Sequence, residues 1–144
     1  MMIVRQLSVF LENKPGRLCA ATDTLAQNGI NISALTLADT AEFGILRLIV
    51  DQPDLARDVL YNSGVIVRIS EVVAIAMNDA PGGAGGILHI LSKAGINVEY
   101  MYACVGRLSG KAIMIIRTDD SETAVKILHE AGYGDINPSE VYRI

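Results

Sequence analysis

The 144-residue chain contains no tryptophan, only two cysteines and two phenylalanines, and charged residues make up 19% of it. Two cysteines, Cys19 and Cys104, are too few for a disulfide framework or a four-cysteine zinc site. The scarcity of aromatic residues, together with a net charge of −4, argues against a nucleic-acid partner. No apolar run approaches the ~18 residues of a membrane-spanning helix, so we expect no membrane partner.

The residues that are present predict a folded cytoplasmic protein with no cofactor and no metal. Hydrophobic residues make up 51% of the chain, which excludes a disordered protein. Arg5 and Gln6 interrupt the first apolar stretch, so we expect no signal peptide and a cytoplasmic location. Neither His89 nor His129 has a second ligand three or four residues away, which predicts that neither binds a metal.

The sequence contains an internal duplication. A shift of 66 residues gives six identities in the 32 columns of residues 7–38, where chance gives about two. Further along, the shift becomes 68, and Gly64 aligns with Gly132. We therefore predict two domains, at residues 1–70 and 71–144. The identical residues include Pro15, Gly16, Gly29 and Asn31, which align with Pro81, Gly82, Gly95 and Asn97.

Each copy predicts the same order of elements: strand, helix, two strands, helix and strand. Pro15 and Pro81 stand where the first turn of a helix accepts proline, and the second helices are expected at 53–63 and 121–131. A fourth strand is expected from Val65 in the first copy, and a weaker one near Glu140-Val141-Tyr142 in the second. Ser70-Glu71 is left as the linker. This order predicts an α+β fold of two ferredoxin-like βαββαβ sandwiches in tandem, with antiparallel sheets and helices on one face.

Two sequence elements in each copy resemble the ACT domain family, which consists of small regulatory modules that bind amino acids and control metabolic enzymes. They are Asn13-Lys14-Pro15-Gly16 and Gly29-Ile30-Asn31-Ile32 in the first copy, and Asp79-Ala80-Pro81-Gly82 and Gly95-Ile96-Asn97-Val98 in the second. The segment from Leu7 to Thr40 is especially similar to the regulatory subunit of acetolactate synthase. Because the two copies cover nearly the whole chain, the resemblance implies a protein that is not an enzyme.

The resemblance implies a regulatory protein that binds a free amino acid at ACT-domain interfaces and has a metabolic enzyme as a possible partner. In the family, the Asn or Asp before Pro-Gly and the Asn after the helix contact the ligand. This pairs Asn13 with Asn31 and Asp79 with Asn97. The alternative function is a regulatory subunit of an amino-acid biosynthetic enzyme such as acetolactate synthase.

The resemblance also bears on assembly, because two ACT modules commonly join edge to edge through their second strands. Within one chain that arrangement separates the strands on either side of the linker by about 29 Å, at ~4.8 Å for each strand spacing. The three or four residues between them reach only about 10–14 Å. Either a strand is exchanged between the copies, or the copies meet differently, or the seam forms between two chains. We expect a homodimer.

The chemistry of a zwitterion favours the start of each first helix as the ligand site. Unpaired backbone amides and the partial positive charge of the helix dipole suit a carboxylate. An asparagine offers both an oxygen and an NH2 group, and an aspartate favours an ammonium. The predicted ligand-binding residues are Asn13, Gly16, Arg17, Leu18 and Asn31 in the first copy, and Asn78, Asp79, Gly82, Gly83, Ala84, Asn97 and Val98 in the second.

A purely structural interpretation of these residues stays open. Asn13 and Asp79 suit helix caps, and Asn31 and Asn97 suit turns. The run at residues 81–86 contains four glycines, each of which costs about 1 kcal/mol inside a helix relative to alanine. It indicates either close approach of the backbone to a ligand or neighbouring element, or an unwound first turn. Close approach is the preferred interpretation, and it makes the second copy the preferred ligand site.

Overall fold

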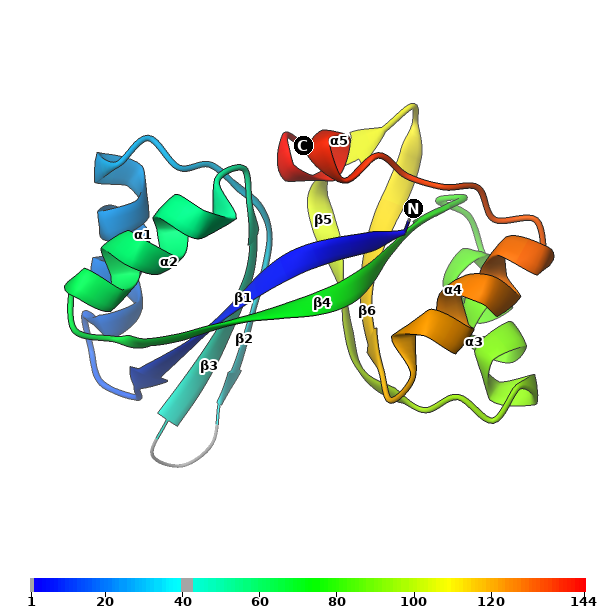
Figure 1. Cartoon of the computed structure of the whole chain (residues 1–144), viewed down its shortest axis with the longest axis horizontal. Helices are drawn as coiled ribbons and strands as arrows, with labels where there is room; N and C mark the ends of the chain where they lie inside the picture. Colours follow the sequence, from blue (N-terminus) through cyan, green and yellow to red (C-terminus); the bar gives the residue numbers. More distant parts are fainter. Residues whose placement is uncertain (1, 40–42) are drawn as a thin grey trace. The chain divides into compact units, whose positions relative to one another are not determined.

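The computed structural model describes residues 2–39 and 43–144, which form two compact units (Figure 1). The N-terminal unit comprises residues 5–70 and Arg143, and the C-terminal unit comprises residues 2–4, 71–142 and Ile144. Both units combine antiparallel strands with helices, which confirms the α+β class predicted from the sequence.

In the N-terminal unit, two helices pack against three strands and the start of a fourth. The elements are β1 (Ile3–Glu12), α1 (Arg17–Gln27), β2 (Ile32–Asp39), β3 (Phe43–Val50), α2 (Pro53–Asn62) and the beginning of β4 (Ile66–Met77). β3 pairs antiparallel with both β1 and β2, and Leu48 lies opposite Leu7 and Leu35. One face of these strands is buried against Leu25 of α1 and Leu60 of α2, which produces the apolar alternation seen in the sequence.

The C-terminal unit repeats this arrangement on the rest of β4. Its further elements are α3 (Gly83–Lys93), β5 (Val98–Leu108), β6 (Lys111–Thr118), α4 (Ser121–Glu130) and α5 (Pro138–Tyr142). β6 pairs antiparallel with β4, where Ile75 lies opposite Met114, and with β5, where Tyr102 lies opposite Ile115. α2 and α4 end within one residue of the predicted ends, so both predicted helices are confirmed.

The segment expected to be a linker is part of a strand. β4 runs without a break through Ser70 and Glu71, and its two ends belong to different units. Residues before Ser70 pack against the core of the N-terminal unit, and Val73 and Ile75 lie in the core of the C-terminal unit. A single strand therefore serves as the last strand of one copy and the first strand of the next.

The start of the chain takes part in the C-terminal unit. The backbone oxygen of Met2 accepts a hydrogen bond from the N–H of Ala74 at 2.6 Å. The Met2 side chain is fully buried in the same core as Val73 and Ile75. The first residues of the chain therefore lie beside β4 and belong to the C-terminal unit, although the sequence places them in the first copy.

The strand expected near Glu140-Val141-Tyr142 is wrong, because these residues belong to helix α5. Pro138 opens this helix, at a position that needs no intrahelical N–H. The Asn137 side-chain oxygen accepts hydrogen bonds from the backbone N–H of Ser139 at 3.1 Å and from its hydroxyl at 2.9 Å. The second copy therefore lacks a fourth strand of its own, and two complete four-stranded sandwiches do not form as predicted.

Candidate functional site

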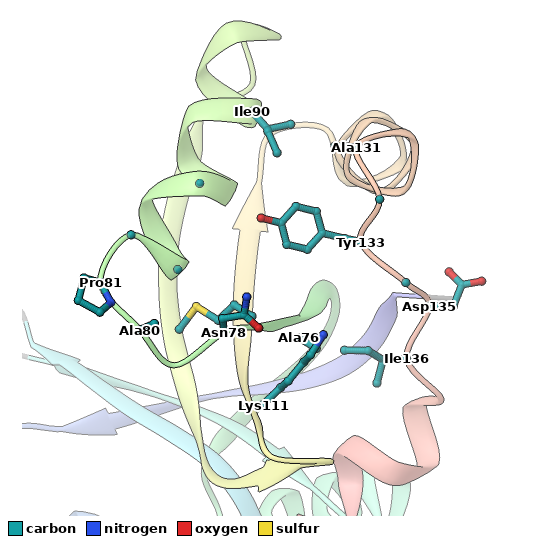
Figure 2. Close-up of a pocket in the computed structure, with 16 residues that line it drawn as sticks. Ala76, Asn78, Ala80, Pro81, Ile90, Lys111, Ala131, Tyr133, Asp135 and Ile136 are labelled. Carbon is teal, nitrogen blue, oxygen red and sulfur yellow. The ribbon is translucent and has the colours of Figure 1, made fainter.

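Each unit contains a cavity at the start of its first helix. In the C-terminal unit the cavity has a volume of about 650 Å³ and lies between the end of β4, the first turns of α3 and the segment after α4 (Figure 2). A volume of this size is typical of small-molecule sites, which span about 300–1,000 Å³. Its polar lining side chains are Asn78, Lys111, Tyr133 and Asp135, and its apolar ones include Met77, Ile90 and Ile136.

The glycines of the second copy shape this cavity. Gly82 is the N-cap of α3 and has a φ of 84°, which glycine adopts without steric cost. A β-carbon on Gly83 would lie 2.1 Å from the backbone oxygen of Asn78, so a larger residue there has to displace the loop. A β-carbon on Gly86 would meet the Tyr133 hydroxyl at 3.5 Å, and a longer side chain would enter the cavity. The glycine run thus allows close approach of loop and helix, and α3 is helical from Gly83 on.

The starts of α1 and α3 differ in detail from the prediction. Both helices begin two residues after the proline, so Pro15 and Pro81 precede the first turn rather than standing in it. A glycine occupies each N-cap position. Within the described residues, the side chains of Asn13 and Asp79 make no hydrogen bond to either helix. The capping interpretation of these two residues is therefore wrong.

The first turn of α3 leaves backbone amides unpaired. The N–H of Gly83 donates to the Ala80 oxygen at 3.0 Å, and the equivalent amide of α1 donates to the Lys14 oxygen at 3.3 Å. These two predicted donors are occupied by the protein's own loops. In the part of the chain that the structure describes, the N–H groups of Ala84 and Gly85 have no partner. Neither Ala84 nor Gly85 lines the cavity, however, so the predicted Ala84 is not placed at it.

Three residues of the predicted set line the larger cavity, namely Asn78, Gly82 and Gly83. Asp79 does not line it, and its carboxylate forms an ion pair with Arg107 of β5. The loop before α3 therefore contributes the Asn78 side-chain amide and backbone groups to the cavity. Its one acidic side chain, Asp79, is paired with Arg107.

Asn31 and Asn97 lie beyond the far ends of α1 and α3, and Val98 begins β5. The N–H of Asn97 donates to the Asp119 carboxylate at 3.0 Å, and that of Asn31 to the Asp51 carboxylate at 2.9 Å. These bonds fix the turn after each helix. A helix of 11 residues is about 16 Å long. Within one unit, an amino acid at the start of the helix cannot also contact the asparagine at its end.

The N-terminal unit has an equivalent but smaller cavity of about 290 Å³. Arg17, Glu12, Phe10 and Phe43 line it. The Glu12 carboxylate lies 3.0 Å from Lys14 Nζ and 3.8 Å from Arg17 Nη2. The hydrogen bond from Lys14 and the charges of both cations lower the pKa of Glu12, so the polar groups at this cavity satisfy one another. The other predicted residues, Asn13, Gly16, Leu18 and Asn31, do not line this cavity.

Sequence reasoning missed Lys111, Tyr133 and Gly86 as lining residues. The duplication relates two of them to positions in the first copy. At the shift of 68, Lys111 aligns with Phe43 and Tyr133 aligns with Val65, and both of these residues line the smaller cavity. The positions are structurally equivalent, and the side chains at them have diverged.

A family model of an ACT domain pair matches residues 2–141. The chain belongs to the ACT domain family. This ACT pair is similar over 99% of its length to 98% of a protein from Bacteroides thetaiotaomicron, with 38% identity and a TM-score of 0.91. The resemblance seen in the sequence motifs is thereby confirmed.

The ACT pair also shares its fold with two regulatory subunits of aspartate kinase. The ligand-free subunit from Thermus thermophilus is 17% identical, with a TM-score of 0.64 and coverage of 91% of this chain and 94% of that one. The subunit from Thermus flavus is 16% identical, with a TM-score of 0.59 and coverage of 91% and 97%. A sequence comparison with curated proteins finds no match.

The described residues offer few groups for metal or covalent chemistry. Among residues 2–39 and 43–144, no three His, Cys, Asp or Glu side chains lie together as metal ligands. In the same part of the chain, no helix is long and apolar enough to cross a membrane. Cys19 is exposed, whereas burial of Cys104 raises the pKa of its thiol to about 11. Cys104 is therefore protonated at neutral pH and unsuited to act as a nucleophile.

Proposed function

We propose that the chain is a non-catalytic regulatory protein that binds a free amino acid and signals amino-acid status. The observation that carries this proposal is the 650 Å³ cavity at the start of α3 in an ACT domain pair. The site is a binding site rather than a catalytic one, because its described lining residues include no cysteine, histidine or serine and only one carboxylate, Asp135.

One helix start gives this cavity a polarity that suits a carboxylate. The start of α3 lines the cavity through Gly82 and Gly83 and carries the positive end of a helix dipole. The residues directly after α4, Ala131 and Gly132, also line the cavity. Their N–H groups and that of Tyr133 already donate to carbonyl oxygens in the last turn of α4. A carboxylate is therefore favoured at the start of α3.

Filling the cavity is the direct test of this proposal. Gly86→Leu places a side chain beside the Tyr133 hydroxyl and suits a helix better than glycine, so the variant is expected to fold. In calorimetry against the twenty amino acids, we expect saturable binding to the wild-type chain. In the variant we expect that binding to weaken by about a hundredfold or more, since steric exclusion removes most of a small ligand's contacts.

The matched control is Ala20→Leu, at the equivalent position in the smaller cavity. This change is expected to leave amino-acid binding intact. If none of the twenty amino acids gives heat or a shift in unfolding temperature with the wild-type chain, the protein is not an amino-acid sensor. Equal loss of binding in both leucine variants would place the ligand outside the larger cavity.

The second candidate function is a regulatory subunit that docks on an amino-acid biosynthetic enzyme. The fold shared with aspartate kinase regulatory subunits over 91% of this chain favours such a partner. Acetolactate synthase, suggested by the first motif, is the other enzyme of this class to test. Co-purification of the tagged chain with either enzyme from the same organism discriminates between a subunit and a free-standing sensor.

We also propose that the protein forms a homodimer. The contact that the family resemblance implies, with Asp79 and Asn97 on one ligand, would need these residues from different domains, since a single unit holds them about a helix length apart. Sedimentation equilibrium is expected to give twice the mass of the chain. A single species with the mass of one chain, both with and without amino acid, would contradict this assembly.

A further inference from the structure

We propose that the cavity of the C-terminal unit selects an amino acid whose side chain ends in a carboxylate, and that Lys111 binds this second carboxylate. We infer in addition that each chain has one such site, because the equivalent cavity of the N-terminal unit is smaller and lacks the corresponding donors. This inference rests on the proposed function and specifies the ligand class of the same cavity.

The cavity has an excess of hydrogen-bond donors without partners. Within the described residues, the side chains of Asn78, Lys111 and Tyr133 make no hydrogen bond or ion pair. Lys111 is an exposed cation at the cavity wall, and no described residue forms an ion pair with it. Figure 2 shows its amine directed toward the middle of the cavity, below Asn78, whereas the carboxylate of Asp135 points away from it. The charge that faces a ligand is positive.

The two positive features come from different walls. The first turn of α3 forms one wall, and Lys111, the first residue of β6, reaches the cavity from another (Figure 2). Each of these two walls can take one of the two carboxylates of an acidic amino acid, which a short aliphatic chain separates. Met77, Ile90 and Ile136 supply apolar contacts for that chain.

The equivalent cavity of the N-terminal unit lacks the side-chain donors that Lys111 and Tyr133 supply in the C-terminal unit. Phe43 stands at the position of Lys111, and Val65 at the position of Tyr133, so neither donor is present. Arg17 stands at the position of Gly83 and is paired with Glu12, the counterpart of Asn78. The cavity is reduced to about 290 Å³. Charge and space both favour the C-terminal unit as the one site.

The test is a calorimetric titration of the full chain with L-glutamate, L-aspartate, L-glutamine and L-asparagine. We expect an acidic amino acid to bind at least about tenfold more tightly than its amide, as a charge-assisted hydrogen bond is stronger than a neutral one. The stoichiometry is expected to be one ligand per chain. Lys111→Met is expected to abolish the preference for acid over amide, and Lys111→Arg to retain it.

Phe43→Met is the matched control, because it changes the equivalent position of the smaller cavity and is expected to leave affinity and preference unchanged. Equal affinity for acids and amides, or a preference that survives Lys111→Met, overturns the assignment of Lys111. Two ligands per chain overturn the single site. Tighter binding of a neutral or basic amino acid refutes the acidic ligand class while amino-acid sensing stands. Absence of binding by all twenty amino acids refutes the proposed function itself.

Discussion

Replacing Gly83 with alanine is expected to destabilise the protein by about 1–3 kcal/mol, the usual cost of forcing extra volume into a packed site. The added β-carbon would lie 2.1 Å from the backbone oxygen of Asn78 and 3.3 Å from its carbonyl carbon. Neither atom belongs to a flexible side chain, so the loop itself has to move. The N–H of Gly83 also donates to the Ala80 oxygen, and that bond holds the loop against the helix.

Gly85→Ala is the control, two residues further along the same helix. A β-carbon there meets nothing within 4 Å. Alanine is expected to stabilise the chain by about 0.5–1 kcal/mol, because it loses less backbone entropy in a helix than glycine. Urea unfolding of both variants measures the contrast. The same sign of change in the two variants would mean that helix propensity, and not the contact with Asn78, decides the outcome.

Met2→Ala is expected to destabilise the protein by about 2–5 kcal/mol, as for other truncations of fully buried apolar side chains. Met2 is 0% exposed and lies in the core of the C-terminal unit. The loss is therefore expected to fall on that unit, although the residue stands at the beginning of the first copy. Amide hydrogen exchange should accelerate in β4 and β6 more than in α1 and α2.

The comparison for Met2 is Tyr61→Ala, because Tyr61 is 71% exposed on α2. A surface change of this kind is expected to alter the free energy of unfolding by no more than about 0.5 kcal/mol. If the exchange of α1 and α2 rises most in Met2→Ala, the first residues stabilise the N-terminal unit instead. That result would refute the assignment of Met2 to the core of the C-terminal unit.

Much of the fold was predictable because it depends on local signals. The left-handed glycines that end α1 and α3, Gly29 and Gly95, have φ values of 67° and 72°, as their place after apolar helices predicted. The same glycine-asparagine pairs carried the ACT resemblance that the family match confirmed. The strand near Val141 was wrong although Pro138 stood before it, because short apolar runs do not distinguish a strand from a short helix.

The ligand cavity was predictable only in part. Asn78, Gly82 and Gly83 lie in one continuous segment around the Pro-Gly turn, and the motif identified them. Lys111 and Tyr133 enter from segments that are far away in the sequence, and no local pattern marks a lysine after a hairpin turn as a lining residue. Their assignment needed the pairing of β6 with β4 and the course of the chain after α4.

The sequence by itself determined that the chain is duplicated, where the second helix of each copy lies, where glycine ends the helices and which family the chain belongs to. These properties follow from periodicity and from residues with special backbone geometry, which act over a few positions. Only the tertiary structure decided that one strand serves both copies, that Met2 completes the core of the C-terminal unit, and that one cavity is larger than its counterpart. The physical reason is that hydrogen bonds at a sheet edge and the volume of a cavity depend on segments brought together from distant parts of the chain.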